Sequence, residues 1–173
     1  MDGRDPLLVR LLARWGSAHY PRVSACLWMA VLLGALAWLD HAGGGVFLVP
    51  PFAATLTILI YLPQVSIAQP LAVVGGSVAG AALGTGLSVL LGFGPGVALL
   101  AALAAMIALP LLRIFHPPGI ALAMYPALLR PGPLFAIDVV LPFTLVAVIS
   151  AAALSRWLPG FPRYPRSRHV DSR

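Results

Sequence analysis

The sequence predicts an all-α, polytopic transmembrane helical bundle, and three properties of the chain lead to this prediction. Of its 173 residues, 60% are hydrophobic and only 9% are charged, and the mean hydropathy is +0.96. A typical soluble domain has about 25% charged residues. Long apolar runs recur between residues 23 and 158, and arginines gather on both sides of them. We therefore expect one transmembrane domain, 23–158, between an Arg-rich N-terminal segment, 1–22, and a basic tail, 159–173.

Four apolar stretches are long enough to form transmembrane helices, which need about 20 residues. The first lies between Arg22 and Asp40, and the third begins with a proline, which suits the first turn of a helix. The last ends at Arg156 and Trp157, a pair typical of a membrane interface. The four expected helices are 23–39, 70–91, 95–112 and 135–158.

The second stretch is rich in small residues and contains two overlapping GxxxG patterns, Gly76 to Gly80 and Gly80 to Gly84. Such patterns allow the backbone of a neighbouring helix to approach closely. Packing inside the bundle is the preferred interpretation, and a homo-oligomer formed through the Gly75–Gly86 helix is the alternative.

Two further apolar segments are too short for ordinary transmembrane helices. Residues 46–62 include Val49-Pro50-Pro51-Phe52, and residues 116–129 begin with His116-Pro117-Pro118-Gly119. About 14 helical residues reach about 21 Å, short of the roughly 30 Å hydrocarbon core. We expect broken or re-entrant segments, so that the chain forms two similar halves, 23–91 and 95–158. If the short segments cross the membrane, the chain has six crossings and the two halves are inverted relative to one another; we favour this alternative. If they only enter and leave on one side, the chain has four crossings and the halves are parallel.

The distribution of arginine predicts the orientation in the membrane. Nine of the eleven arginines lie outside the apolar block 23–154, and there is no lysine. Basic residues that flank membrane helices mark the cytoplasmic side. We expect both termini in the cytoplasm and a location in the bacterial inner membrane. The net charge of +6 is then explained without nucleic acid.

The two Pro-Pro breaks predict an anion site. A proline ends one helix and can occupy the first turn of the next, and the N-terminus of a helix attracts anions. Half-helices inside transporters bind their substrates in this way, near the bilayer midplane. The partner that we expect is a small inorganic anion, besides the lipid bilayer. The candidate substrate-binding residues are Pro50, Pro51, Thr55, Gln69, Ser77, Arg113, His116, Pro117, Pro118 and Gly119.

His116 is ionisable near physiological pH and can pair with the anion or share a proton with it. Alternatively, it only donates a hydrogen bond that fixes the break. Arg113 precedes His116 by three residues and is expected at the same helix end, either attracting anions or reaching towards the interface. Ser77 and His116 could form a catalytic dyad, but nucleophiles, acids and histidines are few, so we expect no enzyme, no metal site and no cofactor.

Five short elements follow one another along the chain: Pro51-Phe52-Ala53-Ala54-Thr55, Ala68-Gln69-Pro70 with Val74-Gly75-Gly76, His116-Pro117-Pro118, Leu141-Pro142-Phe143 and Arg163-Tyr164-Pro165. With these elements in this order the chain resembles the HPP family of integral membrane proteins. The resemblance implies a compact multi-helix bundle and, from chloroplast and cyanobacterial relatives, nitrite transport. The chain departs from the family pattern at Gly119-Ile120-Ala121, where Ala-Gly-Ala is usual, and at Ser77, where His is common. The alternative function is a non-transporting scaffold or dimerisation module.

Overall fold

The computed structural model describes residues 22–43 and 45–166, and this part of the chain is all-α. The predicted N-terminal segment, apart from Arg22, and the last seven residues of the tail lie outside the described residues. Six α-helices are joined by short connections, one of which contains a 3₁₀ turn, Ser66–Ala68. The α-helices are α2 (Val23–Gly43), α3 (Pro50–Tyr61), α4 (Pro70–Leu91), α5 (Pro95–Leu111), α6 (Pro117–Leu129) and α7 (Leu141–Trp157).

Proline sets the start of four of these helices. Pro50, Pro70, Pro95 and Pro117 are each the first residue of a helix. Proline disfavours the helical conformation in the residue before it, and His116 accordingly has φ −137° and ψ 111°. Proline fits the first turn of a helix because an N–H group at that position has no partner within the helix, so its absence costs nothing. The prolines noted in the sequence therefore define helix boundaries directly.

Within the described residues, three helices are long and apolar enough to cross a membrane by length and composition: α2, α4 and the continuous helix Ala136–Trp157. The sequence prediction of four long helices is corrected at 95–112, where α5 has 17 residues and a length of about 26 Å. The two Pro-Pro segments form short helices, α3 and α6, of 12 and 13 residues. The order of long, short and long helices therefore appears twice along the chain, with α5 as the shortest of the longer ones.

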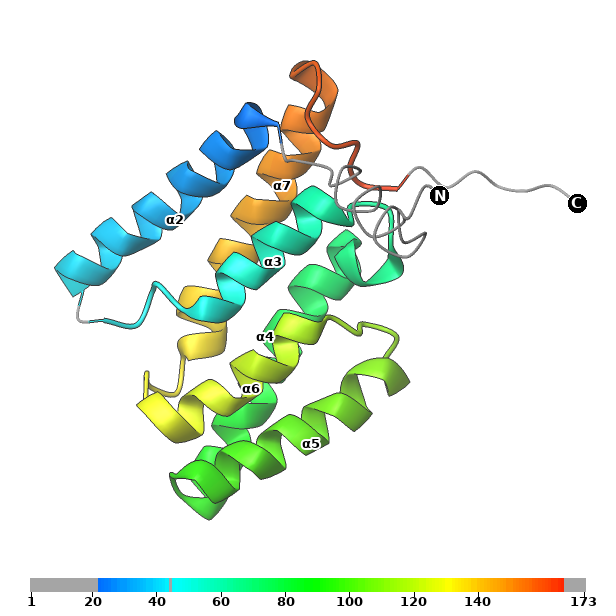
Figure 1. Cartoon of the computed structure of the whole chain (residues 1–173). Coiled ribbons are helices and arrows are strands. Elements are labelled where there is room, and N and C mark those ends of the chain that lie inside the picture. The colour runs from blue at the N-terminus through cyan, green and yellow to red at the C-terminus, as the bar shows by residue number, and fades with distance from the viewer. Residues whose placement is uncertain (1–21, 44, 167–173) are drawn as a thin grey trace, which may run out of the picture.

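Consecutive helices run in opposite directions between two ends of the bundle (Figure 1). One end, the Arg-rich end, comprises Arg22 and residues 62–69, 112–116 and 156–166. Hydrogen bonds join these segments, including one from the Gln64 amide to the Arg163 carbonyl. The opposite end comprises residues 40–43, 45–49, 92–94 and 130–138, and its Gly94 N–H donates to the Ala127 carbonyl at 2.9 Å.

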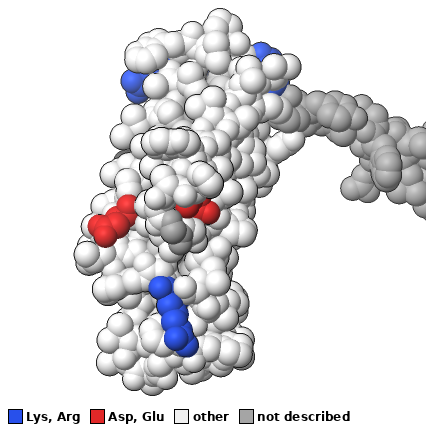
Figure 2. All heavy atoms as spheres, turned by 90° about the vertical axis from the view of Figure 1, so that its left-hand side faces the viewer, with Lys and Arg blue, Asp and Glu red and all other residues white. Residues whose placement is uncertain are grey.

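The charged side chains divide between these ends. Within the described residues, five of the six arginines belong to the Arg-rich end, and Arg130 lies at the opposite end with Asp40 and Asp138. Figure 2 shows the two acidic groups and a basic one on a face that is otherwise largely uncharged. Between the ends, large apolar side chains face outwards, as expected for contact with lipid; Leu90 is 79% exposed and Ile107 63%. The chain is a multi-pass membrane protein.

The last long helix begins with a π-helical turn, Ala136–Val140, before α7. Pro142 lacks an N–H, so an uninterrupted α-helix would leave the Asp138 carbonyl without its usual donor. The Leu141 N–H instead donates to the Ala136 carbonyl, five residues earlier. This wider turn accommodates the proline and carries Asp138, which is exposed.

Helices α4 and α6 pack with their backbones in direct contact. A Cβ atom added to Gly80 would lie 2.1 Å from the Gly119 carbonyl oxygen, and one added to Gly84 would lie 1.9 Å from that of Ala123. Only glycine permits such an approach. The GxxxG face of α4 is thus covered by α6 inside the bundle, and the homo-oligomer considered from the sequence would need another face.

Candidate functional site

His116 connects the two Pro-Pro segments and is buried inside the Arg-rich end of the bundle. It is the residue before α6, and its side chain turns away from that helix towards α3. Its Nδ1 lies 2.8 Å from the Ile67 carbonyl oxygen, and its Nε2 lies 3.0 Å from the Thr55 hydroxyl. A carbonyl can only accept, so Nδ1 carries a hydrogen. His116 is 0% exposed, so no water-sized space touches it.

The Thr55 hydroxyl makes this arrangement compatible with both charge states of His116. Thr55 is 0% exposed, and its hydroxyl also lies 3.1 Å from the Pro51 carbonyl oxygen. When the imidazole is neutral, Thr55 can donate its hydrogen to Nε2. When the imidazole is protonated, Nε2–H can donate to Thr55, which then donates to Pro51. His116 can therefore gain a proton without losing a hydrogen bond.

Ser77 supplies a buried polar atom with no partner. The side chain is 0% exposed, and its hydroxyl makes no hydrogen bond within the described residues. A buried unsatisfied hydroxyl costs about 1–3 kcal/mol. The preceding residue, Gly76, packs against His116, since a Cβ atom there would lie 2.9 Å from the His116 Cβ. Both ring nitrogens of His116 are engaged elsewhere, so the structure shows no Ser77–His116 dyad.

The amide donors expected at the Pro-Pro breaks are already used. Pro117 and Pro118 have no N–H, and the Gly119 N–H donates to the His116 carbonyl at 2.8 Å. Pro50 and Pro51 likewise have none, and the Phe52 N–H donates to the Val49 carbonyl at 3.0 Å. Side chains rather than free amides therefore carry the polarity of this site.

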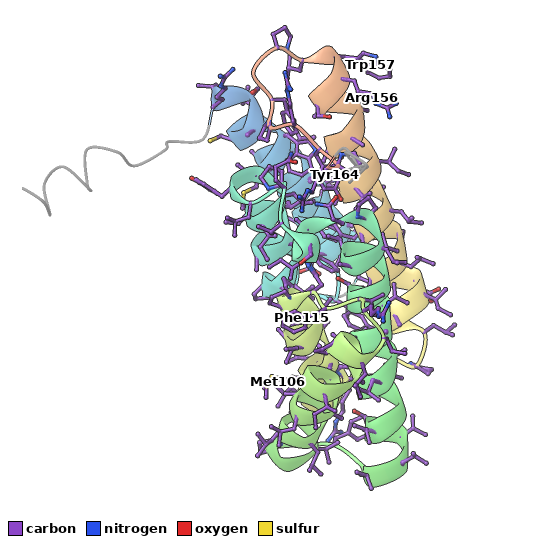
Figure 3. All side chains as sticks on the ribbon, turned by 90° about the vertical axis from the view of Figure 1, so that its right-hand side faces the viewer. Met106, Phe115, Arg156, Trp157 and Tyr164 are labelled. Atoms are coloured by element: carbon purple, nitrogen blue, oxygen red, sulfur yellow. The ribbon has the colours of Figure 1, made fainter. Side chains whose placement is uncertain are left out.

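Gln69 lies beside the site but takes part in a different set of contacts. Its amide nitrogen donates to the carbonyls of Pro63 and Val65, and its amide oxygen accepts from the Arg166 N–H at 3.0 Å. These bonds hold the α3–α4 connection against the tail. Figure 3 shows Tyr164 among the helices, whereas Arg156 and Trp157 lie at the tip of α7. Gln69 thus holds the tail against the α3–α4 connection. That connection contains Ile67, whose carbonyl oxygen contacts His116.

Arg113 and His116 lie in different surroundings. It has φ +58° and follows the end of α5, where its N–H donates to Pro110 and the next N–H, that of Ile114, donates to Leu109. This is a Schellman ending, in which a left-handed residue closes the helix. The Arg113 side chain is exposed and His116 is buried. Arg113 and His116 were expected on one side of the same helix end. Instead, Arg113 follows α5 and His116 precedes α6.

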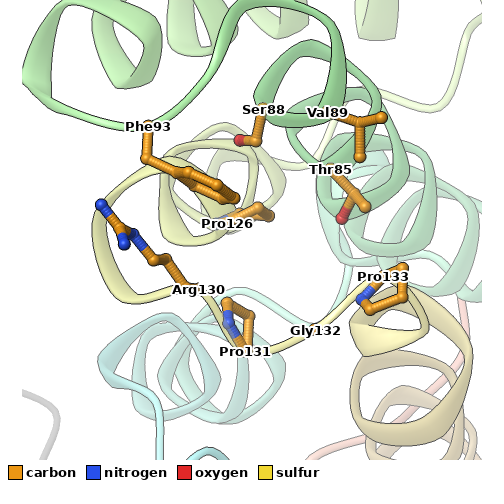
Figure 4. Close-up of a pocket in the computed structure, with 9 residues that line it drawn as sticks. All are labelled: Thr85, Ser88, Val89, Phe93, Pro126, Arg130, Pro131, Gly132 and Pro133. Carbon is orange, nitrogen blue, oxygen red and sulfur yellow. The ribbon is translucent and has the colours of Figure 1, made fainter.

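A cavity of about 260 Å³ lies at the opposite end, where α4 and α6 terminate (Figure 4). Its polar groups are Thr85, Ser88 and Arg130. The Thr85 and Ser88 hydroxyls donate to carbonyls of their own helix, and the Arg130 guanidinium lies 4.5 Å from the centre of the Phe93 ring. This cavity was not predicted from the sequence, although Arg130-Pro131-Gly132-Pro133 indicates a rigid turn.

Metal ligands do not gather at either place. Across residues 22–43 and 45–166, no three side chains of His, Cys, Asp or Glu are grouped in a way that could hold a metal ion.

The model of the HPP transmembrane region matches residues 17–165, which include both Pro-Pro segments and the tail contacts. This chain belongs to the HPP family. The resemblance drawn from the five sequence elements is thereby confirmed. No curated protein and no solved structure matches the chain. In this HPP protein the tripeptide of the family name supplies one buried histidine, which bonds to α3, and two prolines, which begin α6.

Proposed function

We propose that this HPP protein transports a small monovalent anion, with nitrite as the expected substrate, through a site formed by His116 and Thr55 between the two short helices. The observation that carries the proposal is the chain of hydrogen bonds Ile67–His116–Thr55–Pro51. It joins both Pro-Pro segments at one buried, ionisable side chain. An ionisable group inside a membrane bundle is expensive to keep and points to function.

The charge balance of the site supports an anion as the substrate. A protonated His116 would be a buried cation, which is costly without a partner of opposite charge. The acids of the described chain, Asp40 and Asp138, both belong to the opposite end of the bundle, away from the Ile67 and His116 connections. A small anion beside His116 would provide the missing charge. Proton uptake and anion binding would then favour each other, which is the basis of proton-coupled transport.

In the described state the site is closed, because His116, Thr55 and Ser77 are all fully buried. Transport requires a second state in which this site opens. The unpartnered Ser77 hydroxyl is a donor for an anion in such a state. Nitrite, a weakly basic anion, needs few donors, and these three side chains offer enough.

Nitrite uptake into proteoliposomes tests the proposal. We expect uptake above that of empty liposomes, stimulated by an inward proton gradient, and its loss in His116→Ala and Thr55→Val. Thr57→Val is the matched control, because Thr57 is exposed and donates only to its own helix. Arg113→Ala should retain most of the uptake. Wild-type flux equal to that of empty liposomes would overturn the proposal.

We also propose six crossings in the bacterial inner membrane, with the Arg-rich end in the cytoplasm. The alternating helix directions and the five arginines at one end support this topology. The single free cysteine of the described chain, Cys26, can be replaced by serine before labelling. Cysteines at Ser66 and Arg163 should then react from the cytoplasmic side and one at Leu134 from the other side. Reaction of Ser66→Cys from outside would support four crossings.

The packed centre favours a second candidate, a membrane scaffold that transports nothing. Backbone contact between α4 and α6 leaves no space for a path between them. If the protein is a scaffold, we expect no nitrite flux in the wild type and an unchanged fold in His116→Gln. If it is a transporter, the wild type shows nitrite uptake and His116→Gln loses it.

A further inference from the structure

A second feature lies between α2 and α7, on the outside of the bundle. At the Arg-rich end Trp28 joins the two helices: its indole N–H donates to the Ser150 hydroxyl at 2.9 Å, and its ring meets that of Phe161 edge to face, 5.6 Å between centres. Towards the opposite end the helices leave a groove of about 350 Å³ between them.

The groove has apolar walls and one charged group. Its walls include Leu32, Leu36 and Leu39 of α2, Phe47 of the following loop, and Phe143 and Val146 of α7. Asp138 is the charged residue of the lining, and none of the lining residues is basic. A carboxylate beside so much apolar surface calls for a positive partner, and the groove itself supplies none.

The local backbone explains why Asp138 lies there. It belongs to the π-helical turn that Pro142 imposes, and its N–H donates to the Leu134 carbonyl at 2.8 Å, in the first turn of the helix. Asp138 is therefore about 6 Å along the helix from Leu134 and is the third residue of the apolar stretch Ala136–Trp157, so we expect its carboxylate close to the lipid headgroups. Asp40, the other acid at this end, is engaged differently, because its carboxylate accepts from the N–H groups of Phe47 and Leu48.

We propose that this groove binds one phospholipid whose headgroup carries a primary amine, such as phosphatidylethanolamine, with an acyl chain between α2 and α7 and the ammonium group on Asp138. In a membrane protein, lipid chains cover an outward apolar groove of this kind. The carboxylate then selects among headgroups, because it attracts an ammonium group and repels the net negative charge of phosphatidylglycerol. This lipid site is independent of the proposed anion transport.

Native mass spectrometry of the purified full chain, given equal amounts of phosphatidylethanolamine and phosphatidylglycerol, tests the proposal. We expect preferential retention of phosphatidylethanolamine by the wild type. Asp138→Asn should reduce that preference about tenfold, equivalent to about 1.4 kcal/mol, while leaving the groove intact. Ala35 of α2 also lines the groove, so Ala35→Trp should fill the groove and displace both lipids.

Ala37→Trp is the matched control, since Ala37 is exposed on the same helix and does not line the groove. It should retain phosphatidylethanolamine as the wild type does. Equal retention of the two lipids by the wild type, an unchanged preference in Asp138→Asn, or equal displacement by the two tryptophans would overturn the proposal.

Discussion

The Nε2 atom of His116 lies 3.0 Å from the hydroxyl of Thr55, a residue 61 positions earlier in the chain. This hydrogen bond joins α6 to α3, the two helices that begin with a double proline. The same hydroxyl reaches the Pro51 carbonyl, so that one rotating hydrogen can serve either acceptor. The contact therefore links the His116-Pro117-Pro118 motif to the Pro50-Pro51 segment in the other half of the chain.

Thr55→Val should destabilise the fold, because it replaces the hydroxyl by a methyl group of similar shape. His116 Nε2 would then be buried without a partner, at a cost of about 1–3 kcal/mol in the free energy of unfolding. Thr55→Ser should keep most of the stability. Denaturation in detergent micelles measures these differences, and Thr57→Val is the exposed control. Equal stabilities of the Thr55→Val and Thr57→Val variants would contradict the assigned hydrogen bond.

Gly80→Ala and Gly84→Ala should each lower the free energy of unfolding by about 1–3 kcal/mol, because their methyl groups would collide with the α6 backbone. Gly86→Ala is the control on the same helix, as nothing lies within 4 Å of a Cβ atom there. It should be neutral or stabilising by up to about 1 kcal/mol, since alanine favours a helix more than glycine. If all three variants have the same free energy of unfolding, the close packing of α4 on α6 does not determine the effect of these substitutions.

Gln69→Leu should release the tail from the α3–α4 connection. The variant loses two hydrogen bonds within the loop and one to the Arg166 N–H. We expect faster trypsin cleavage after Arg163, which gel analysis of intact and clipped protein would follow. Ser66→Ala, an exposed change in the same loop, should leave the cleavage rate unaltered. An identical rate in both variants would show that Gln69 does not fasten the tail.

Tyr164 should make stability depend on pH in the alkaline range. Burial raises the pKa of its phenol above the ordinary value of about 10. The unfolded chain then loses this proton before the folded chain does, so the free energy of unfolding falls as pH rises above about 10. Tyr164→Phe should reduce that fall, whereas Tyr61→Phe, at an exposed position, should not. The comparison of the two variants from pH 8 to 11 checks the assignment.

At neutral pH, Tyr164→Phe should leave stability unchanged or slightly increased. The Tyr164 hydroxyl is buried and has no hydrogen-bond partner within the described residues. Removing an unsatisfied polar atom relieves a desolvation cost. A clear loss of stability at pH 7 would show that this hydroxyl has a partner after all.

Most helix boundaries could be predicted from the sequence because proline fixes them locally. Pro70, Pro95 and Pro117 begin helices at the expected positions. The π-helical turn before Pro142 was not predicted, although the missing proline N–H explains it. The end of α5 was predicted to within one residue, and Arg113 closes the helix there in a left-handed conformation that usually belongs to glycine.

The candidate site was only partly predictable, since its contacts join distant residues. The double prolines and His116 indicated where the chain breaks, but the Thr55 hydroxyl and the Ile67 carbonyl depend on how α3 packs beside α6. The roles of Gln69 and Arg113 could not be read from their chemistry alone. A polar side chain near a break can equally well hold a loop or face solvent, and only the tertiary structure distinguishes these cases.

The glycine contacts of α4 have a consequence for any conformational cycle of the protein. Gly76, Gly80 and Gly84 bring the two backbones together without intervening side chains, so α4 and α6 cannot slide past each other without atomic overlap. They form a rigid pair that includes the backbone of His116. The moving part of the His116 site must then be α3 with the loop that follows it. In such a cycle α3 is the gate and the α4–α6 pair is the frame against which it opens.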